Sequence, residues 1–429
     1  MATTPGPGSG LSRRSFLGRG SAAAGAVVGV GLLANGCTAG QGSAPTAAGD
    51  LGVTTGGESR LGRVEFHGVH QAGIVSPQPP AAVVAAFDVV AGDAAALGTV
   101  LQALTTEARA LTAGDVAAEA DPLRPPADNL ILGPTPSPDG LTVTVSVGAS
   151  LFDARFGLGD KKPVQLVEMP RFPNDQLERD QLHGDLVIEV AGGAPDTCQH
   201  ALRRLMRATR SSLVLRWMLP GFLRPNTQTV GTSTRNLLGF KDGTANPDGT
   251  DAALMDELVW VQSGGVEPAW AVGGSYHVVR LIRMRVEFWD RTALHTQETI
   301  IGRHKGTGAP LDGSAETDIP DFASDPHGST FRLDGHIRLA NPRTSATDAN
   351  RIVRRGFNYA LGFDKAGQLD QGLLFQCFQR DLHAGFVTVQ GRLDGEALEE
   401  YITPFGGGYF FALPGVTDER DWLGRSLLA

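Results

Sequence analysis

One histidine, His336, stands in a stretch whose residue types suit metal chemistry. Residues 333–359 read LDGHIRLANPRTSATDANRIVRRGFNY, so that a short alternation of apolar and charged residues follows His336 and a cationic segment comes after it. The alternation predicts a strand or its edge, ending at Asn341 and Pro342. An imidazole there is suited to ligating a metal ion, and equally to a hydrogen-bonded place in the core or a loop. A single histidine does not separate these two interpretations.

An aspartate between glycines forms the second candidate. Residues 239–247 read GFKDGTANP and place Asp242 between Gly239 and Gly243. The glycines favour a tight turn and allow the backbone to approach a flat ligand closely. Asp242 itself fits either an Asx turn or a carboxylate that transfers protons. Arg354, in RIVRRG, adds a guanidinium that stays charged at any working pH.

Together these pieces resemble the dye-decolourising (DyP-type) haem peroxidases, and among them the exported branch that includes the deferrochelatase/peroxidases of iron uptake. The resemblance rests on His336 within HIRLANPR, on GFKDG around Asp242, on Arg354 and on the early segment HQAGI at residues 70–74. It spans both halves of the chain after residue 60.

The resemblance implies haem b as the cofactor, with His336 as the axial ligand of its iron on the proximal face. Asp242 is then the distal group that passes a proton between the two oxygens of peroxide, and Arg354 stabilises the negative charge that develops as the O–O bond breaks. The second ring nitrogen of His336 needs a carboxylate or carbonyl partner, for which Asp381 is a candidate. Arg355 is expected at the surface or beside a haem propionate.

Further haem contacts are implied by the resemblance as well. The haem edge, the proximal side and one propionate are expected to be contacted by Gly243, Thr244, Ala245, Asn341, Pro342, Arg343 and Arg303. The apolar wall of the distal pocket is expected from Leu373, Leu374 and Phe375, although plain packing explains these three residues equally well.

Three classes of function are compatible with these residues. The first is a peroxidase that reduces hydrogen peroxide through an oxyferryl intermediate and oxidises bulky organic donors or metal ions. The second is iron acquisition, by releasing iron from haem or by oxidising ferrous iron for a partner permease. The third is non-catalytic haem binding or transport. Asp242 and Arg354 argue against the third class, because carrying haem requires neither a proton shuttle nor a charge clamp.

Composition limits the partners and the compartment. A chain of 429 residues with 41% hydrophobic and 19% charged residues is typical of a soluble globular protein with room for two cores. Its formal net charge of −9 disfavours nucleic acid as a partner. The cysteines Cys37, Cys198 and Cys377 are too few for a disulfide framework or a zinc site, and the sequence leaves a bond between the last two open. A homo-oligomer is also expected.

The first 37 residues carry a targeting signal. Arg13 and Arg14 stand in SRRSFL, and an Ala/Gly/Val/Leu run at residues 21–34 has the length of a signal h-region. This pattern predicts export by the twin-arginine route to the periplasm, the cell envelope or the medium.

Two processing sites compete after this signal. Cys37 follows an imperfect lipobox and would carry a lipid anchor, whereas residues 44–48, APTAA, offer a signal peptidase site. The lipoprotein is slightly favoured, because it explains the cysteine. Residues 38–60 are Gly/Ala/Thr/Ser-rich and typical of a flexible tether.

The remaining chain predicts an α+β fold in two units, residues 61–228 and 229–429. In the first unit we expect strands and helices, in chain order, at residues 81–90, 94–111, 141–147 (a half-buried strand), 185–190 and 198–209 (a helix capped by Asp or Thr). In the second we expect strands at residues 275–287, 373–378, 385–389 and 405–413, and a short helix at 395–401. The resemblance implies tandem ferredoxin-like domains with antiparallel sheets and haem held mainly by the C-terminal one.

Overall fold

The computed structural model describes residues 61–116, 121, 123–225 and 233–429, all within one compact unit, Gly57–Ala429. The twin-arginine segment, Cys37 and the tether at residues 38–60 lie outside the described residues, so export and lipidation stay predictions. Within the described part, no helix combines the length and apolar character needed to cross a membrane.

A nine-stranded antiparallel sheet organises the described residues. Its strands, in the order in which they lie side by side, are β7 (Ser275–Met284), β11 (Ile402–Ala412), β2 (Thr142–Gly148), β3 (Leu186–Gly192), β1 (Ala81–Val89), β4 (Leu213–Phe222), β9 (Phe357–Phe363), β10 (Leu369–Gln379) and β8 (Val353–Arg354). Because β10 also pairs with β7, the sheet closes on itself. A separate two-stranded ribbon joins β5 (Thr234–Arg235) to β6 (Lys241–Asp242).

Each half of the chain builds a ferredoxin-like unit. The first half runs β1, α1 (Ala94–Ala113), β2, β3, α2 (Pro195–Ala208), β4, and its strands lie in the order β2-β3-β1-β4. The second half repeats this plan with β7, β9, β10, α7 (Thr388–Leu393) and β11, and its strands lie in the order β11-β7-β10-β9. A β-α-β-β-α-β succession of this kind is the ferredoxin-like motif, which confirms the predicted fold class.

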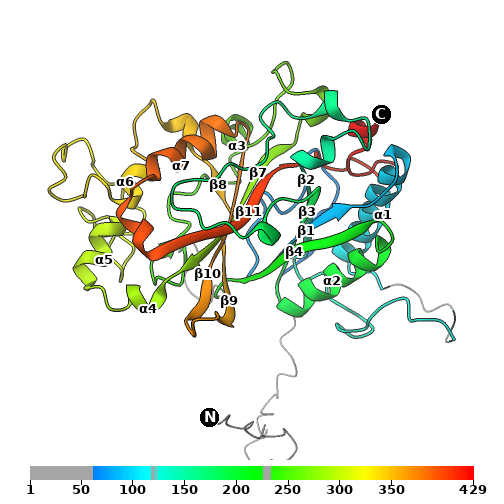
Figure 1. The fold of residues 1–429 in the computed structure, drawn as a ribbon, viewed down its shortest axis with the longest axis horizontal. Helices are drawn as coiled ribbons and strands as arrows, with labels where there is room; N and C mark the ends of the chain where they lie inside the picture. Colours follow the sequence, from blue (N-terminus) through cyan, green and yellow to red (C-terminus); the bar gives the residue numbers. More distant parts are fainter. Residues whose placement is uncertain (1–60, 117–120, 122, 226–232) are drawn as a thin grey trace, which may run out of the picture. The chain divides into compact units, whose positions relative to one another are not determined.

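The helices of the two halves occupy different regions. Figure 1 shows α1 and α2 beside β1 to β4, whereas most helices of the second half gather on the far side of β7, β10 and β11. The last helix, α8 (Arg425–Leu428), lies beside α1 instead. The helices of the second half are α3 (Ala252–Leu258), α4 (Val286–Trp289), α5 (Leu294–Ile301), α6 (His336–Ala340), α7 and α8 (Arg425–Leu428).

Helix α1 confirms the apolar periodicity read from the sequence. Asp93 accepts a hydrogen bond from the amide of Ala96 at 2.8 Å, and Gly114 ends the helix with a left-handed backbone. Helix α2 begins earlier than predicted, at Pro195, and its N-cap makes no side-chain hydrogen bond. The predicted Asp or Thr cap is therefore wrong, because Thr197 donates instead to Asp139.

Two cores flank the first-half sheet. One lies between this sheet and helices α1 and α2, and the other fills the interior that the closed sheet encloses. The interior core takes side chains from both halves, including Val84, Val187, Val279, Leu374 and Phe410. The two halves therefore share apolar packing in addition to strand pairing.

Strand β2 is buried along its whole length, although its alternating sequence predicted one solvated face. Helices cover one face, and the closed interior takes the other. Burial of the polar side chains is tolerated because they are hydrogen-bonded. Thr144 donates to the carbonyl of Ala72 at 2.8 Å, and Ser146 lies 3.0 Å from Nδ1 of His277.

The strand predicted at residues 385–389 does not exist. A π-helical turn, His383–Val387, leads directly into α7 in this region. A five-residue apolar run does not separate the periods of helix and strand, which explains the error. The short helix predicted at residues 395–401 is present as a 3₁₀ helix, Ala397–Tyr401. Both described cysteines, Cys198 and Cys377, are buried and free.

Candidate active site

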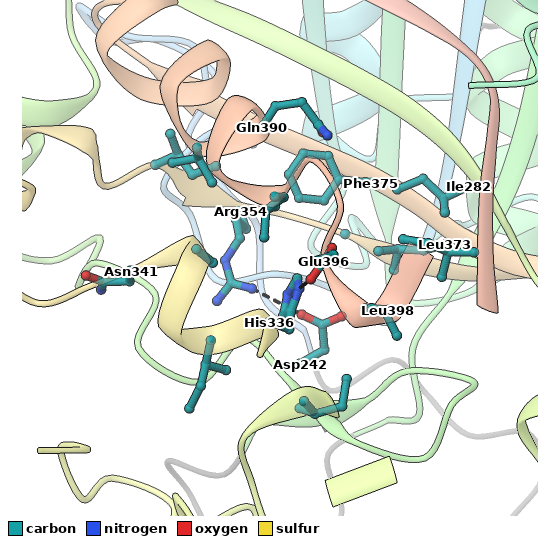
Figure 2. Close-up of a pocket in the computed structure, with 18 of the residues that line it drawn as sticks. Asp242, Ile282, His336, Asn341, Arg354, Leu373, Phe375, Gln390, Glu396 and Leu398 are labelled. Atoms are coloured by element: carbon teal, nitrogen blue, oxygen red, sulfur yellow. Dashed lines mark hydrogen bonds and ion pairs between the residues drawn. The ribbon is translucent and has the colours of Figure 1, made fainter. Parts of the chain in front are cut away.

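A cavity of about 280 Å³ opens among α6, α7, β7, β10 and the loop that follows β6. Figure 2 shows His336 on one side and Asp242 with Arg354 near it, all facing the same space. The cavity thus brings together the three residues singled out in the sequence, which come from three separate segments.

His336 is the first residue of α6, which follows Gly335. Its Nδ1 lies 2.7 Å from Oε2 of Glu396, a carboxylate that is only 4% exposed. No hydrogen bond from Nε2 occurs among the described residues, and the ring remains 32% exposed. The imidazole is therefore fixed through one nitrogen, which leaves the other for a ligand.

Two expectations about His336 are wrong. The predicted strand is a short helix, because an alternation of only a few residues also fits the helical period. The proposed partner Asp381 instead accepts a hydrogen bond from the amide of Ala384 at 2.8 Å, within the turn that precedes α7. Glu396 takes the role that the sequence left open.

Burial lowers the pKa of His336, and the charge and hydrogen bond of Glu396 raise it by more, so that its pKa ends above the usual value. The same carboxylate selects the tautomer, since it requires a proton on Nδ1. Nε2 of the neutral ring is then an electron-pair donor, as an axial metal ligand must be.

Asp242 lies on β6, with 32% of its side chain exposed. Its Oδ1 lies 3.3 Å from a guanidinium nitrogen of Arg354, and its Oδ2 accepts a hydrogen bond from Asn236 at 3.3 Å. Gly239 has a φ of 86°, and a Cβ there would approach Cε of Lys305 to 2.6 Å. The turn into Asp242 therefore requires a glycine at position 239.

Arg354 is held at both backbone polar atoms and at its guanidinium. Asn246 accepts from the amide of Arg354 at 2.9 Å and donates to its carbonyl at 3.1 Å. The guanidinium also donates to the carbonyl of Thr244 at 3.0 Å. The loop after β6 therefore positions Arg354 as well as Asp242.

Most other predicted contacts also line the cavity. The set comprises Gly243, Thr244, Ala245, Arg303, Asn341, Arg343, Leu373 and Phe375. Pro342 is not part of the lining, and Leu374 packs in the closed interior. Successive side chains of a strand point to opposite faces, so Leu373 and Phe375 cannot share a wall with Leu374.

Two further arginines add positive charge to the cavity. Arg303 donates to the carbonyls of Gly308 and Glu316 at 2.7 and 3.0 Å. The Arg343 guanidinium makes no hydrogen bond or ion pair with any described residue, and its backbone is left-handed with a φ of 58°. Burial lowers the pKa of both groups, and the charge of Arg343 lowers that of Arg303 further. Such a lining favours an anionic ligand.

Arg355 contradicts its predicted place at the surface or near a propionate. The residue follows β8 and is 4% exposed. Extended backbone sends neighbouring side chains to opposite sides, so Arg354 faces the cavity and Arg355 faces the closed interior.

The sequence also missed cavity residues from the first half. Phe172, Asn174 and Asp175 line the cavity, and Asp175 forms a buried ion pair with Arg280 at 2.5 Å. Proline-rich loops carry no periodicity, so no local signal points to these side chains. Glu396 was missed as well, because only the fold brings it to His336 and nothing in its own neighbourhood marks it as a partner.

Comparisons with known proteins identify the family. The model described as Dyp-type peroxidase, N-terminal, matches residues 71–223, and the corresponding C-terminal model matches residues 233–417. The chain is 50% identical over 403 residues to a protein named Deferrochelatase from Shigella flexneri serotype 5b (strain 8401), covering 93% of this chain and 95% of that protein. It is 52% identical over 374 residues to Deferrochelatase from Escherichia coli (strain K12), covering 86% and 88%.

Solved structures agree with this grouping. Ferric DtpA from Streptomyces lividans matches with a TM-score of 0.78 and 34% identity, covering 86% of this chain and 97% of that chain. A DyP-type peroxidase from Cellulomonas bogoriensis matches with a TM-score of 0.76 and 35% identity, covering 85% and 98%. The chain belongs to the DyP-type peroxidase family. It is a haem-dependent peroxidase with the ferredoxin-like layout described above.

The cavity residues fit haem. His336 presents a free Nε2, the wall formed by Leu373 and Phe375 is apolar, and Arg343 carries an uncompensated guanidinium. A porphyrin requires an axial base, apolar contact with its ring and cations for its two carboxylates. All three requirements are met by different sides of one cavity.

Proposed function

We propose that this chain reduces hydrogen peroxide at a haem held by His336, with Asp242 and Arg354 as the catalytic residues. The observation that carries the proposal is the arrangement of three groups around one cavity: an imidazole with a free Nε2, a carboxylate and a guanidinium. Haem, when bound, supplies the redox-active iron. The protein supplies the axial base, the proton transfer and the charge stabilisation.

The axial base depends on Glu396. Glu396 accepts a hydrogen bond from Nδ1 of His336 at 2.7 Å, which gives the imidazole partial anionic character and makes Nε2 a stronger electron-pair donor. Glu396 itself is 4% exposed, so its charge is weakly screened. The pair thus holds the ring and sets its basicity together.

Asp242 and Arg354 divide the work on peroxide. The Asp242 carboxylate takes a proton from one oxygen and returns it to the other, which leaves as water. Arg354 stabilises the negative charge that accumulates while that proton is in transit. The two side chains lie 3.3 Å apart, so that both reach one peroxide molecule. A haem carrier needs neither group, which favours the enzyme over the transport alternative.

A second proposed activity is the release of iron from haem. It is favoured by relatives named Deferrochelatase at 50 to 52% identity over 86 to 93% of this chain. The chain would then serve iron acquisition, together with a permease for the released iron. Bulky organic donors remain the alternative reducing substrates, and a homo-oligomer is proposed as the assembly.

The proposed location is outside the cytoplasm, after export by the twin-arginine route and with a lipid anchor at Cys37. The support is the sequence alone: Arg13 and Arg14, the run at residues 21–34 and the cysteine that follows it.

Replacing His336 by Ala should remove haem. The purified variant should lack the Soret band, and added imidazole should restore it by filling the place of the lost ring. Glu396→Gln should weaken haem retention by about 10- to 100-fold, as expected for the partner of a metal-ligating histidine. Exposed His327 gives the control, since His327→Ala should keep the spectrum. An unchanged spectrum in His336→Ala would remove this residue as the ligand.

Asp242→Asn and Arg354→Leu should each slow the reaction with peroxide by roughly 10²- to 10⁴-fold. The two losses should not add fully, because the side chains act on the same molecule. Stopped-flow mixing of haem-loaded variants with peroxide measures both rates. Asp248→Asn, at an exposed turn nearby, should react like the parent. If both site variants react with peroxide at the parental rate, neither residue has the proposed role and non-catalytic haem transport becomes the better proposal.

Iron release should appear as two products in equal amounts when the protein is incubated with haem and a reductant. Ferrous iron is measured with a chelating dye, and metal-free porphyrin by its fluorescence. His336→Ala should give neither product. Bleaching of the porphyrin without fluorescence would contradict release with the ring intact.

Changing Arg13 and Arg14 together to Lys should retain the protein in the cytoplasm. Cys37→Ser should free the exported protein from the membrane fraction, because it removes the site of lipid attachment. Cell fractionation and immunoblotting distinguish the outcomes. If Cys37→Ser stays membrane-bound, the anchor is wrong and simple secretion becomes the better proposal.

A further inference from the structure

Glu189 is a buried carboxylate that the chemistry above does not use. It lies in the middle of β3, is 1% exposed, and neither of its carboxylate oxygens has a hydrogen-bond partner. Val187 and Ala191, on the same face of the strand, belong to the apolar core of the closed interior. Burial raises the pKa of Glu189 to about 6, although the charge of Arg355 and the nearby side chain of Gln376 both oppose this rise.

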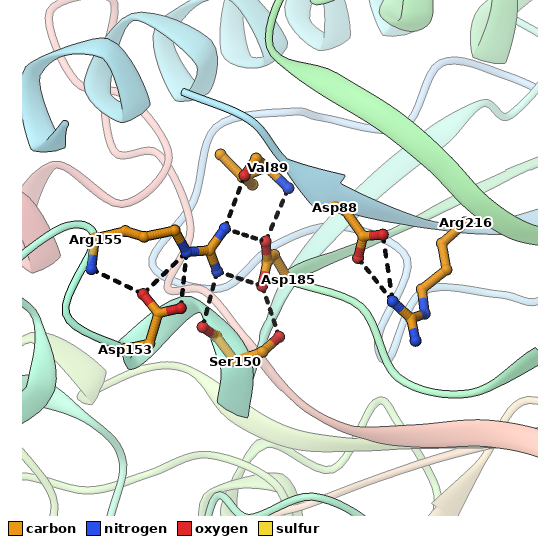
Figure 3. Close-up of polar contacts among 7 residues, drawn as sticks. All are labelled: Asp88, Val89, Ser150, Asp153, Arg155, Asp185 and Arg216. Carbon is orange, nitrogen blue, oxygen red and sulfur yellow. Dashed lines mark hydrogen bonds and ion pairs between the residues drawn. The ribbon is translucent and has the colours of Figure 1, made fainter. Parts of the chain in front are cut away.

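A second carboxylate, just before the same strand, shows how unusual Glu189 is. Asp185 accepts four hydrogen bonds, two from Arg155 at 2.9 Å, one from Ser150 at 2.6 Å and one from the amide of Val89 at 2.8 Å (Figure 3). Burial acts against its charge, and these donors outweigh it, so that its pKa falls below the usual value. The fold can therefore saturate a buried carboxylate, but at Glu189 it provides only the nearby side-chain amide of Gln376, which makes no hydrogen bond of ordinary geometry with the carboxylate.

Arg355 is the counter-charge of Glu189 and is itself incompletely paired. One guanidinium nitrogen donates to the carbonyl of Ser76 at 2.5 Å, while Nε and Nη2 are buried without an acceptor. Glu189 belongs to the first half of the chain and Arg355 to the second. Each interacts with the charge of the other, yet no direct contact joins them.

The neighbouring polar side chains, Gln376 and His277, already form hydrogen bonds with other groups. Gln376 accepts from Nε2 of His277 at 3.1 Å and donates to the carbonyl of Arg355 at 3.5 Å. With Nε2 donating, Nδ1 of His277 accepts from Ser146 at 3.0 Å. Burial lowers the pKa of His277 to about 3, which keeps this ring neutral. These bonds hold Gln376 against the backbone of Arg355. They leave both carboxylate oxygens of Glu189, and Nε and Nη2 of Arg355, without a hydrogen bond of ordinary geometry.

Buried charges without hydrogen bonds cost several kcal/mol each, so the atoms between Glu189 and Arg355 require partners. Water satisfies both sides, because its oxygen accepts from a guanidinium while its protons go to a carboxylate. We propose that Glu189 and Arg355 enclose an internal water site, and that this water-bridged ion pair makes Glu189 a positioning residue for Arg354.

Glu189 can influence the cavity through Arg355, which is the residue next to Arg354 in the chain. Arg355 is covalently joined to Arg354, and its amide donates to Gln376 of β10 at 2.9 Å. On the cavity side, Asn246 holds the backbone of Arg354 through two hydrogen bonds. Arg354 is thus fixed from the cavity by Asn246 and from the interior by its neighbour. Loss of the ion pair between Glu189 and Arg355 should therefore allow the Arg354 guanidinium to move from its position in the cavity.

The inference rests on the role proposed for Arg354. Fluoride binding to the haem-loaded protein tests the position of the Arg354 guanidinium without any enzymatic turnover. A small anion bound at ferric haem is stabilised by a fixed distal guanidinium. Fluoride affinity of the haem-loaded protein should therefore fall in Arg354→Leu. It should also fall in Glu189→Gln, by about two- to thirtyfold, the range for residues that act on a site from outside it. In Arg354→Leu, the added Glu189→Gln change should have no further effect.

Two controls separate positioning from general damage. Asp185→Asn breaks a buried carboxylate network just before the first residue of the same strand and should lower thermal stability without changing fluoride affinity. The pair Glu189→Gln/Arg355→Gln removes both buried charges, so it should fold even where Glu189→Gln alone does not. It should still bind fluoride more weakly than the parent, because the anchor is lost.

The outcomes are distinct. Unchanged fluoride affinity in Arg354→Leu overturns the role proposed for Arg354 itself. A loss in Arg354→Leu with parental affinity in Glu189→Gln, or an equal loss in Asp185→Asn, overturns the positioning role of Glu189. A crystal structure of the haem-loaded parent should show ordered water between Glu189 and Arg355. Direct contact between the two side chains, or a dry gap, overturns the water site.

Discussion

The register between β7 and β10 is the constraint on which the cavity depends. Leu373 pairs with Ile282 on the cavity face, and Leu374 pairs with Leu281 in the closed interior. A shift by one residue would exchange the two sets and place the wrong side chains over the cavity. The short strand β8 pairs with the end of β10, so the same register also carries Arg354 to its place. The direction of the cavity side chains on β7, β8 and β10 is therefore set by strand pairing within the second half.

Local patterns in the sequence predicted much of this frame. The apolar spacing of residues 94–111 predicted helix α1, and runs of apolar residues predicted most strands. His336, Asp242 and Arg354 were found together because their short motifs resemble one family, and the cavity does bring them together. The ferredoxin-like layout came from the same resemblance, since periodicity gives elements and not their order in a sheet.

The rest was not predictable, because it depends on contacts between distant segments. Glu396 lies 60 residues after His336, and nothing in its neighbourhood marks it as the partner. Leu374 and Arg355 were misplaced because a strand buried on both faces gives no sign of which face meets the cavity. For Leu374 and Arg355 the residue type was informative, but the closure of the sheet decides to which face each side chain points.

The cationic lining of the cavity has a consequence for the protein without haem. Arg303, Arg343 and Arg354 face one space, and the charges of Arg343 and Arg354 both act, after burial, to lower the pKa of Arg303. Like charges in a weakly polar enclosure repel until counter-ions screen them. Added salt should thus stabilise the haem-free fold, whereas it weakens ordinary surface ion pairs. The carboxylates of a bound porphyrin would supply counter-charge in the same place, so the effect of salt should become smaller once haem is loaded.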